Sequence, residues 1–144
     1  MTKGQPTTAR PHFCLFMSST SSAPAALAGI KVLDLSRVLA GPWCTQTLAD
    51  LGADVIKVER PVAGDDTRHW GPPFLPRDDG QATQEASYFT ACNRNKRSVT
   101  IDMSTPDGQQ LIRQMAAGAD VLVENFKVGG LCLLYTSPSP RDRG

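Results

Sequence analysis

One stretch of this 144-residue chain constrains its fold more than any other, and it reads VLDLSRVLAGPWCTQTLADLGADVIKVER over residues 32–60. A mostly apolar run at 30–35 predicts a buried strand. A proline that opens residues 42–51 predicts a helix, because proline is tolerated at the first helical position. Residues 55–58 predict a second strand. This order is one βαβ unit, which places loops and a helix N-terminus beside the carboxyl ends of parallel strands, where open α/β sheets bind phosphate-bearing ligands.

The same pattern repeats further along the chain. Residues 97–103 alternate like a strand, Thr105-Pro106 supplies an N-cap and a first-turn proline, and residues 120–124 read as another strand. Because crossovers between parallel strands are right-handed, these units predict an α/β fold, a parallel sheet with covering helices. The first helix is expected to face the sheet with Cys44, Thr47, Leu48 and Leu51.

Between the two units, residues 61–85 are rich in glycine, proline and aspartate. These residues break regular structure and predict a long surface loop. Long loops inside a domain are usually functional, so we expect this one to cover a binding cleft or a partner subunit. Trp70 and Phe74 are its expected anchors.

Composition excludes several classes of function. The formal net charge of +1 gives no electrostatic case for nucleic acid or a membrane surface as partner. The four cysteines are far apart without a CxxC pair, so we expect reduced thiols and no metal site. No apolar run approaches the ~20 residues that cross a bilayer.

The two ends of the chain differ in composition from its middle. Residues 1–28 contain no acidic residue and predict a disordered leader, with Met17 as an alternative start. The protein is expected to be cytoplasmic, and the alternative, a transit peptide, would place it in the mitochondrial matrix. Residues 131–144 lack any period that continues the domain and predict a foreign tail on the front fragment of a longer protein.

Several charged residues have a structural and a functional interpretation. Asp34 and the Asp65-Asp66 pair are expected to serve as caps or ion-pair partners rather than metal ligands. Glu59 is expected to pair with a nearby cation such as Lys57 or Arg60, since no GxGxxG turn supports a dinucleotide site. For Arg60 both a ligand role and an ordinary surface role stay open.

The run Asn93–Arg97 (NRNKR) places three cations in four positions. It predicts a site for a phosphate-bearing metabolite or a solvated rim, because the aromatic residues and recognition helix of a nucleic-acid site are missing.

Four segments in order, VLDLSRVLAGPWCTQTLADLGADVIKVERP, GDDTRHWGPPF, NRNKRSVTIDM and DVLVENF, resemble the start of the class III coenzyme A transferases, the CaiB/BaiF family. The resemblance covers residues 29–130. It implies a Rossmann-like large domain of an interlaced dimer, with coenzyme A (CoA) bound at the carboxyl ends of the strands. Acyl-CoA and a carboxylic acid are then the substrates, no cofactor is tightly bound, and the full-length protein is a homodimer.

The resemblance also carries individual positions over to this chain. Arg60 matches an arginine on the adenine side of CoA. Leu39 stands where formyl-CoA transferase has glutamine, which argues against a formyl- or oxalate-specific enzyme. The CoA-binding positions implied are Leu39, Ala40, Arg60, Ile101, Asp102, Met103, Ser104, Asn125, Phe126 and Lys127.

In this family an aspartate attacks the acyl-CoA thioester and forms a covalent intermediate. That aspartate is expected beyond Phe126, so no catalytic residue is assigned here and the chain by itself is expected to lack turnover. The implied reaction moves CoA from a donor such as succinyl-CoA to a carboxylic acid. The alternatives are an α-methylacyl-CoA racemase-like fragment, a non-catalytic CoA-binding or dimerising module and, from another class, nucleic-acid binding.

Overall fold

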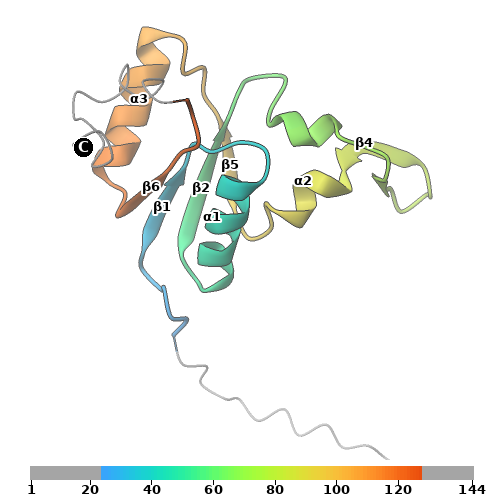
Figure 1. Ribbon diagram of the computed structural model, residues 1–144, viewed down its shortest axis with the longest axis horizontal. Coiled ribbons are helices and arrows are strands. Elements are labelled where there is room, and N and C mark those ends of the chain that lie inside the picture. The colour runs from blue at the N-terminus through green and yellow to red at the C-terminus, as the bar shows by residue number, and fades with distance from the viewer. Residues whose placement is uncertain (1–23, 128–144) are drawn as a thin grey trace, which may run out of the picture.

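Four parallel strands form the sheet at the centre of the computed structural model, which describes residues 24–127 (Figure 1). The predicted tail and most of the predicted leader lie outside these residues. Leu27, assigned to the leader, donates its backbone N–H to the Leu51 carbonyl at 2.9 Å and packs against the core, so ordered structure begins before residue 29. The elements around the sheet are β1 (Lys31–Asp34), α1 (Ala40–Asp50), β2 (Asp54–Glu59), β5 (Arg97–Thr100), α3 (Pro106–Ala117) and β6 (Val121–Val123).

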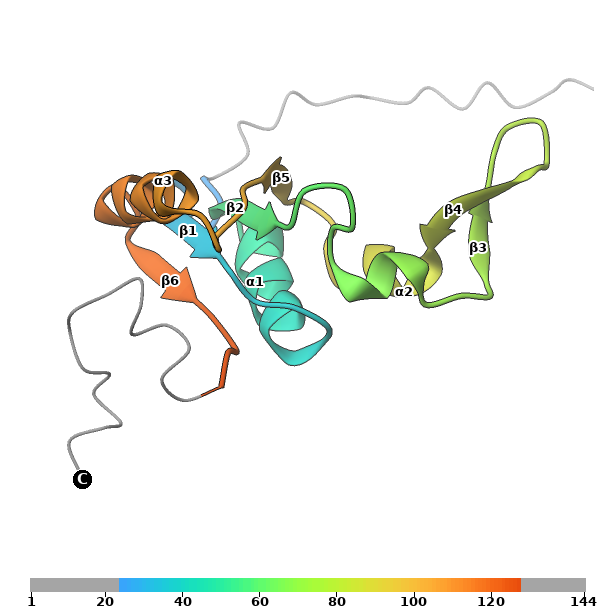
Figure 2. The same ribbon diagram turned by 90° about the horizontal axis from the view of Figure 1, so that it is seen from above.

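The strand order is β5-β2-β1-β6, and every neighbouring pair is parallel. The chain moves outward from β1 through β2 to β5, and α3 then carries it back to the other side of β1. Figure 2 shows α1 and α3 on opposite faces of the sheet. The predicted α/β fold is confirmed. Because the direction of travel reverses at β1, the carboxyl ends of β1 and β6 flank a topological switch point, where such sheets bind ligands.

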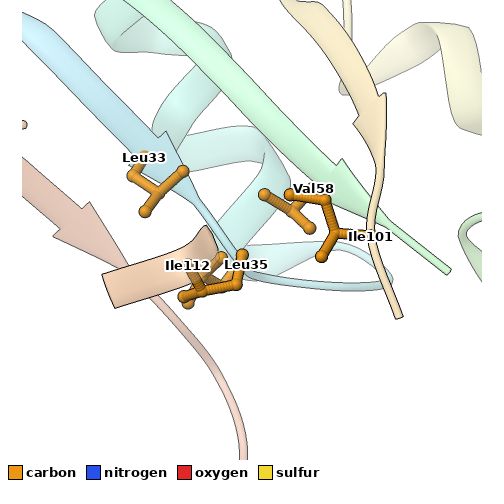
Figure 3. Close-up of a cluster of buried hydrophobic side chains, with 5 residues drawn as sticks. All are labelled: Leu33, Leu35, Val58, Ile101 and Ile112. Carbon is orange, nitrogen blue, oxygen red and sulfur yellow. The ribbon is translucent and has the colours of Figure 1, made fainter. Parts of the chain in front are cut away.

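Each face of the sheet has its own apolar core. On the α3 face, Leu33, Leu35, Val58, Ile101 and Ile112 pack together (Figure 3). The α1 face is apolar only toward the amino ends of the strands, where the buried residues are Val32, Ala49, Ala53 and Val55. Toward the carboxyl ends the same face buries charged side chains instead, namely Asp34, Lys57 and Glu59.

The prediction for the face of α1 was right for Leu48, which packs against the core, and wrong for Cys44, Thr47 and Leu51. The residues that α1 buries are Gly41, Pro42, Thr45, Gln46 and Ala49, whereas Cys44 and Leu51 are exposed. Two polar residues face inward because they complete buried hydrogen bonds: Thr45 Oγ1 donates to Asp34 at 2.6 Å, and Gln46 Oε1 accepts from the Arg94 N–H at 3.2 Å. The spacing of apolar residues therefore does not identify the buried face of α1, because that face is partly polar.

The segment between β2 and β5 is more regular than the predicted loop. It contains a 3₁₀ turn η1 (Asp66–His69), an antiparallel hairpin of β3 (Phe74–Pro76) with β4 (Ala82–Ala86), and α2 (Ser87–Ala91). The hairpin lies on the β5 side, away from β6 (Figure 2). Trp70 remains 47% exposed and packs edge-on against Tyr88, with ring centroids 5.4 Å apart, while Phe74 is half-buried against Gly71.

Among the helices of residues 24–127, none has both the length and the apolar character needed to cross a bilayer.

Candidate ligand-binding site

A shallow pocket lies at the carboxyl edge of the sheet, beside the switch point. The ends of β1 and β2, the loop after β2 and the turn after β5 form its wall. Two predicted ligand residues, Arg60 and Met103, belong to that wall. The full lining is Leu35, Arg37, Val58, Glu59, Arg60, Gly64, Asp65 and Met103.

A larger hollow lies at the opposite edge, where the amino ends of β1, β2 and β5 meet the end of α3. Its lining includes Lys31, Asp54, Arg97 and Met115, and none of the predicted ligand residues. We place the candidate site at the carboxyl edge, because the loops diverge there and ligands of open α/β sheets bind there.

Two half-exposed arginines stand at the rim of the pocket and share one carboxylate. Arg60 forms an ion pair with Asp66, and Arg37 Nη1 lies 3.7 Å from the other oxygen of Asp66. A guanidinium can bind a phosphate or carboxylate in a fork or stack on a planar ring. An anionic ligand that reaches this rim therefore finds two cations, which Asp66 holds together. Arg37 was not among the residues predicted from the sequence.

Asn125 joins the two sides of the switch point. Its side-chain amide accepts from the Arg37 N–H at 2.9 Å and donates to the Arg37 carbonyl at 2.7 Å. This pair of hydrogen bonds extends the contact between β1 and β6 beyond the strands. Next to it, the Phe126 ring lies under the Arg37 guanidinium, 5.8 Å from the ring centroid, and Lys127 is exposed. Two of the three predicted residues after β6, Asn125 and Phe126, therefore contact Arg37 at the crevice, and the side-chain amide of Asn125 uses both its oxygen and its nitrogen in doing so.

The first turn of α1 starts at the same crevice. Leu39 is the N-cap of α1, has no side-chain capping hydrogen bond and is 40% exposed, and Ala40 follows it on the surface. Gly41 lets the helix approach the end of β1 closely, because a Cβ at this position would lie 2.2 Å from the Cβ of Ser36. The close contact between Gly41 and Ser36 thus holds the preceding residues, Leu39 and Ala40, at the carboxyl edge of the sheet.

The predicted segment 101–104 divides into inner and outer residues. Ile101 is buried in the α3-side core, so its side chain is unavailable to a ligand. Asp102 and Ser104 are exposed, and Ser104 donates its backbone N–H and its hydroxyl to Asp102 at 2.9 and 2.6 Å. These hydrogen bonds lower the pKa of Asp102. Met103 is half-buried between the pocket and the core.

Buried ion pairs lie directly beneath the loops of this edge. Lys57 Nζ is 2.9 Å from Asp65, and both side chains are 1% exposed. Lys96 Nζ is 3.0 Å from Asp34, which also accepts hydrogen bonds from Ser36. Asp34 and Asp65 therefore have structural roles, as expected, and Asp65 caps η1 by accepting from the Thr67 N–H.

The prediction that Glu59 pairs with a cation is confirmed, but the partner is Arg68 rather than Lys57 or Arg60. Glu59 accepts two hydrogen bonds from Arg68, both at 2.7 Å, and one from Ser98 at 2.6 Å. Burial raises the pKa of Glu59, but the donors from Arg68, Ser98 and the Asp65 N–H outweigh it and lower the pKa to about 2. Arg68 in turn lies 3.7 Å above the Phe89 ring. Its side chain comes from η1, inside the segment predicted as an irregular loop.

The cations of Asn93–Arg97 do not form an open patch. Arg94 pairs with Asp50, Lys96 with Asp34 and Arg97 with Asp54, at 2.5, 3.0 and 2.6 Å. These pairs join the start of β5 to α1, β1 and β2. Within residues 24–127, no group of three or more His, Cys, Asp and Glu side chains is arranged to hold a metal ion.

Known proteins resemble this chain over most of its length. Residues 27–138 match the profile of CoA-transferase family III. The chain is 53% identical to a succinate–glutarate CoA-transferase of Agrobacterium fabrum, over 80% of this chain and 28% of that protein. It is 52% identical to the succinyl-CoA:glutarate CoA-transferase of Homo sapiens, over 73% of this chain and 22% of that protein.

A similar solved structure is that of a CaiB/BaiF family protein from Brucella suis. It matches 78% of this chain with a TM-score of 0.70 and 56% sequence identity, and the match covers 29% of the Brucella chain. The present chain thus spans between 22% and 28% of the length of the two transferases above.

Proposed function

The chain belongs to CoA-transferase family III, and from that membership we propose that it forms the CoA-binding part of an enzyme that moves CoA from an acyl-CoA to a carboxylic acid. Succinyl-CoA is the proposed donor and a dicarboxylic acid the proposed acceptor. The similar transferases of Agrobacterium fabrum and Homo sapiens, whose names carry succinate or succinyl-CoA and glutarate, support this choice.

The observation that carries the proposal is the pair of arginines at the switch point. Arg37 and Arg60 stand half-exposed at the rim of the pocket and share Asp66. CoA carries phosphates and an adenine ring, which are the groups that guanidinium side chains bind by forks and by stacking. We assign the nucleotide end of CoA to this rim, with Met103 and Ser104 on one side and Phe126 and Lys127 on the other.

We propose that the covalent step uses a nucleophilic aspartate. No aspartate of this chain stands in a sequence context that matches the nucleophile of the family. The carboxylate oxygen attacks the thioester carbonyl, the carbon–sulfur bond breaks and CoA leaves as the thiolate. No tightly bound cofactor takes part, and the whole enzyme is proposed to be a homodimer. The role of residues 24–127 in this scheme is to bind and orient the nucleotide.

Calorimetric titration of the chain with CoA tests the proposal. Arg60→Ala is expected to weaken binding by about tenfold or more, because it removes a charge-assisted contact. Arg97→Ala is the matched control: it also removes an arginine that pairs with an aspartate, but at the amino edge of the sheet, and it should change affinity less than about threefold. Absence of binding at millimolar CoA, or an equal loss in both variants, would contradict the assignment.

A further inference from the structure

Val38 adopts a backbone conformation that its side chain disfavours. Its φ is 72°, in the left-handed region, where a β-branched residue is rare. Val38 lies between β1 and α1, directly before Leu39 and Ala40. Conformations of this kind persist only where the surroundings hold them, and they are concentrated at binding and catalytic sites.

Asp65 is the group that holds this turn. Both of its carboxylate oxygens accept from the Val38 N–H, at 3.4 Å each. Thr67 fixes the same carboxylate by donating its backbone N–H at 3.0 Å and its hydroxyl at 2.7 Å. On the other side of Val38, the Cys92 thiol lies 3.7 Å from the Val38 carbonyl.

Lys57 keeps Asp65 charged in a buried place. Its Nζ lies 2.9 Å from Asp65 and also donates to the Ser36 carbonyl at 2.9 Å. Burial raises the pKa of Asp65, but the hydrogen bonds from Thr67 and Lys57 outweigh it, so the pKa is lowered and the carboxylate is ionised. One lysine thus ties the loop after β2 to the loop after β1.

The next residue secures the same turn from outside. Asp66 binds Arg37, which precedes Val38, and it also binds Arg60. The loop after β2 therefore holds the Arg37-Val38 turn twice, by Asp65 in the interior and by Asp66 at the surface. Such a double attachment fixes where α1 begins and which backbone atoms face the crevice.

We propose that Asp65 is a positioning residue of the CoA site, which holds Val38 at positive φ and so fixes the segment 39–40 that follows. The inference rests on the proposed function for its ligand. Asp65 itself is buried, and Val38, Thr67 and Lys57 already occupy its carboxylate. It acts through the backbone of Val38, whose own side chain opposes the conformation.

A double-mutant cycle with Val38→Gly tests this role, because glycine adopts positive φ without steric cost. Asp65→Asn is expected to weaken CoA binding by about tenfold, roughly 1.4 kcal/mol. Val38→Gly alone should stay within about threefold of the original chain, and Asp65→Asn combined with Val38→Gly should recover most of the loss. General destabilisation by Asp65→Asn would not be rescued by glycine at this one position.

Asp65→Asn leaves Lys57 buried without its counter-charge, which is strongly destabilising. The cycle is therefore repeated with Lys57→Met added to Asp65→Asn, so that both charges are removed together. NMR-derived φ at residue 38 gives a readout that needs no ligand: it should be positive in the original chain and leave the left-handed region when Asp65 and Lys57 are both replaced.

Distinct results overturn the two proposals. If the original chain fails to bind CoA, the proposed function is wrong, whatever the value of φ. If the original chain binds CoA but the Asp65 variants keep its affinity, or if glycine at position 38 restores nothing, Asp65 has no positioning role. A positive φ at Val38 in the variant that lacks both charges also contradicts that role.

Discussion

Glu59 ends β2 as a buried carboxylate that binds three different segments. It accepts from Arg68 in η1, from Ser98 in β5 and from the Asp65 N–H in the loop between β2 and η1. Because the folded protein lowers the pKa of Glu59 to about 2 from an ordinary value of 4.5, the ionised form stabilises the fold. That stabilisation is present above about pH 4.5 and is lost as the pH falls toward 2.

Glu59→Gln removes this pH-dependent contribution. We expect the variant to be less stable than the original chain at pH 7 by about 3 kcal/mol, and the difference to shrink between pH 4.5 and 2. Denaturant unfolding at a series of pH values measures it. Asp54→Asn is the control, since its ion pair with Arg97 is exposed and should contribute under about 1 kcal/mol. A Glu59→Gln difference that is constant with pH would disprove the linkage.

Among the elements, α1 depends on one contact with the end of β1. Gly41 leaves room for the Cβ of Ser36, which would lie 2.2 Å from a Cβ at position 41. Gly41→Ala must therefore push the start of α1 away from the sheet. We expect a loss of about 1–3 kcal/mol in unfolding free energy and a weaker affinity for CoA.

Gly118→Ala is the matched control for this substitution. Gly118 is the C-cap of α3, and a Cβ there would meet only the Met115 carbonyl, at 3.7 Å. Its effect on stability should be under about 0.5 kcal/mol, and CoA affinity should not change. Equal losses in the two glycine variants would show that the contact between Gly41 and Ser36 does not position α1.

The elements that the sequence predicted are those with a clear local pattern. The apolar run before Asp34 and the Thr105-Pro106 cap correspond to β1 and to the start of α3, where the Thr105 hydroxyl accepts from the Gly108 N–H at 3.1 Å. Leu48 on the predicted face of α1 does pack against the core, but Thr45 and Gln46 were missed because they are buried for hydrogen bonding rather than for apolar contact. Hairpin β3–β4 was missed because its strands are short and β3 ends at a proline, Pro76.

For the candidate site, the position of a residue at the end of a strand predicted which residues line the pocket. The sequence did not predict which charged residues pair with one another. Arg60 and Met103 were predicted and do line the pocket. Arg37 and the pairing of Lys57 with Asp65 were missed, because a carboxylate can reach several nearby cations and only the folded loop selects one. The positive φ of Val38 left no signal in the sequence, since valine is an ordinary strand residue.

At the scale of the whole molecule, the two edges of the sheet differ in character. The carboxyl edge combines the switch point, two arginines and a layer of buried ion pairs that fix its loops. The amino edge has a larger hollow, but its arginine, Arg97, pairs with Asp54 across neighbouring strands. Topology and charge therefore favour the carboxyl edge for an anionic nucleotide, although the pocket there is the smaller one.

Amide chemical-shift mapping of the ¹⁵N-labelled chain during titration with CoA is the most direct test of this assignment. We predict saturable shifts concentrated at residues 37–41, 60, 101–104 and 125–127, with little change at Lys31, Asp54 and Arg97. Shifts centred on those three amino-edge residues, or no saturable shift at millimolar CoA, would contradict the account.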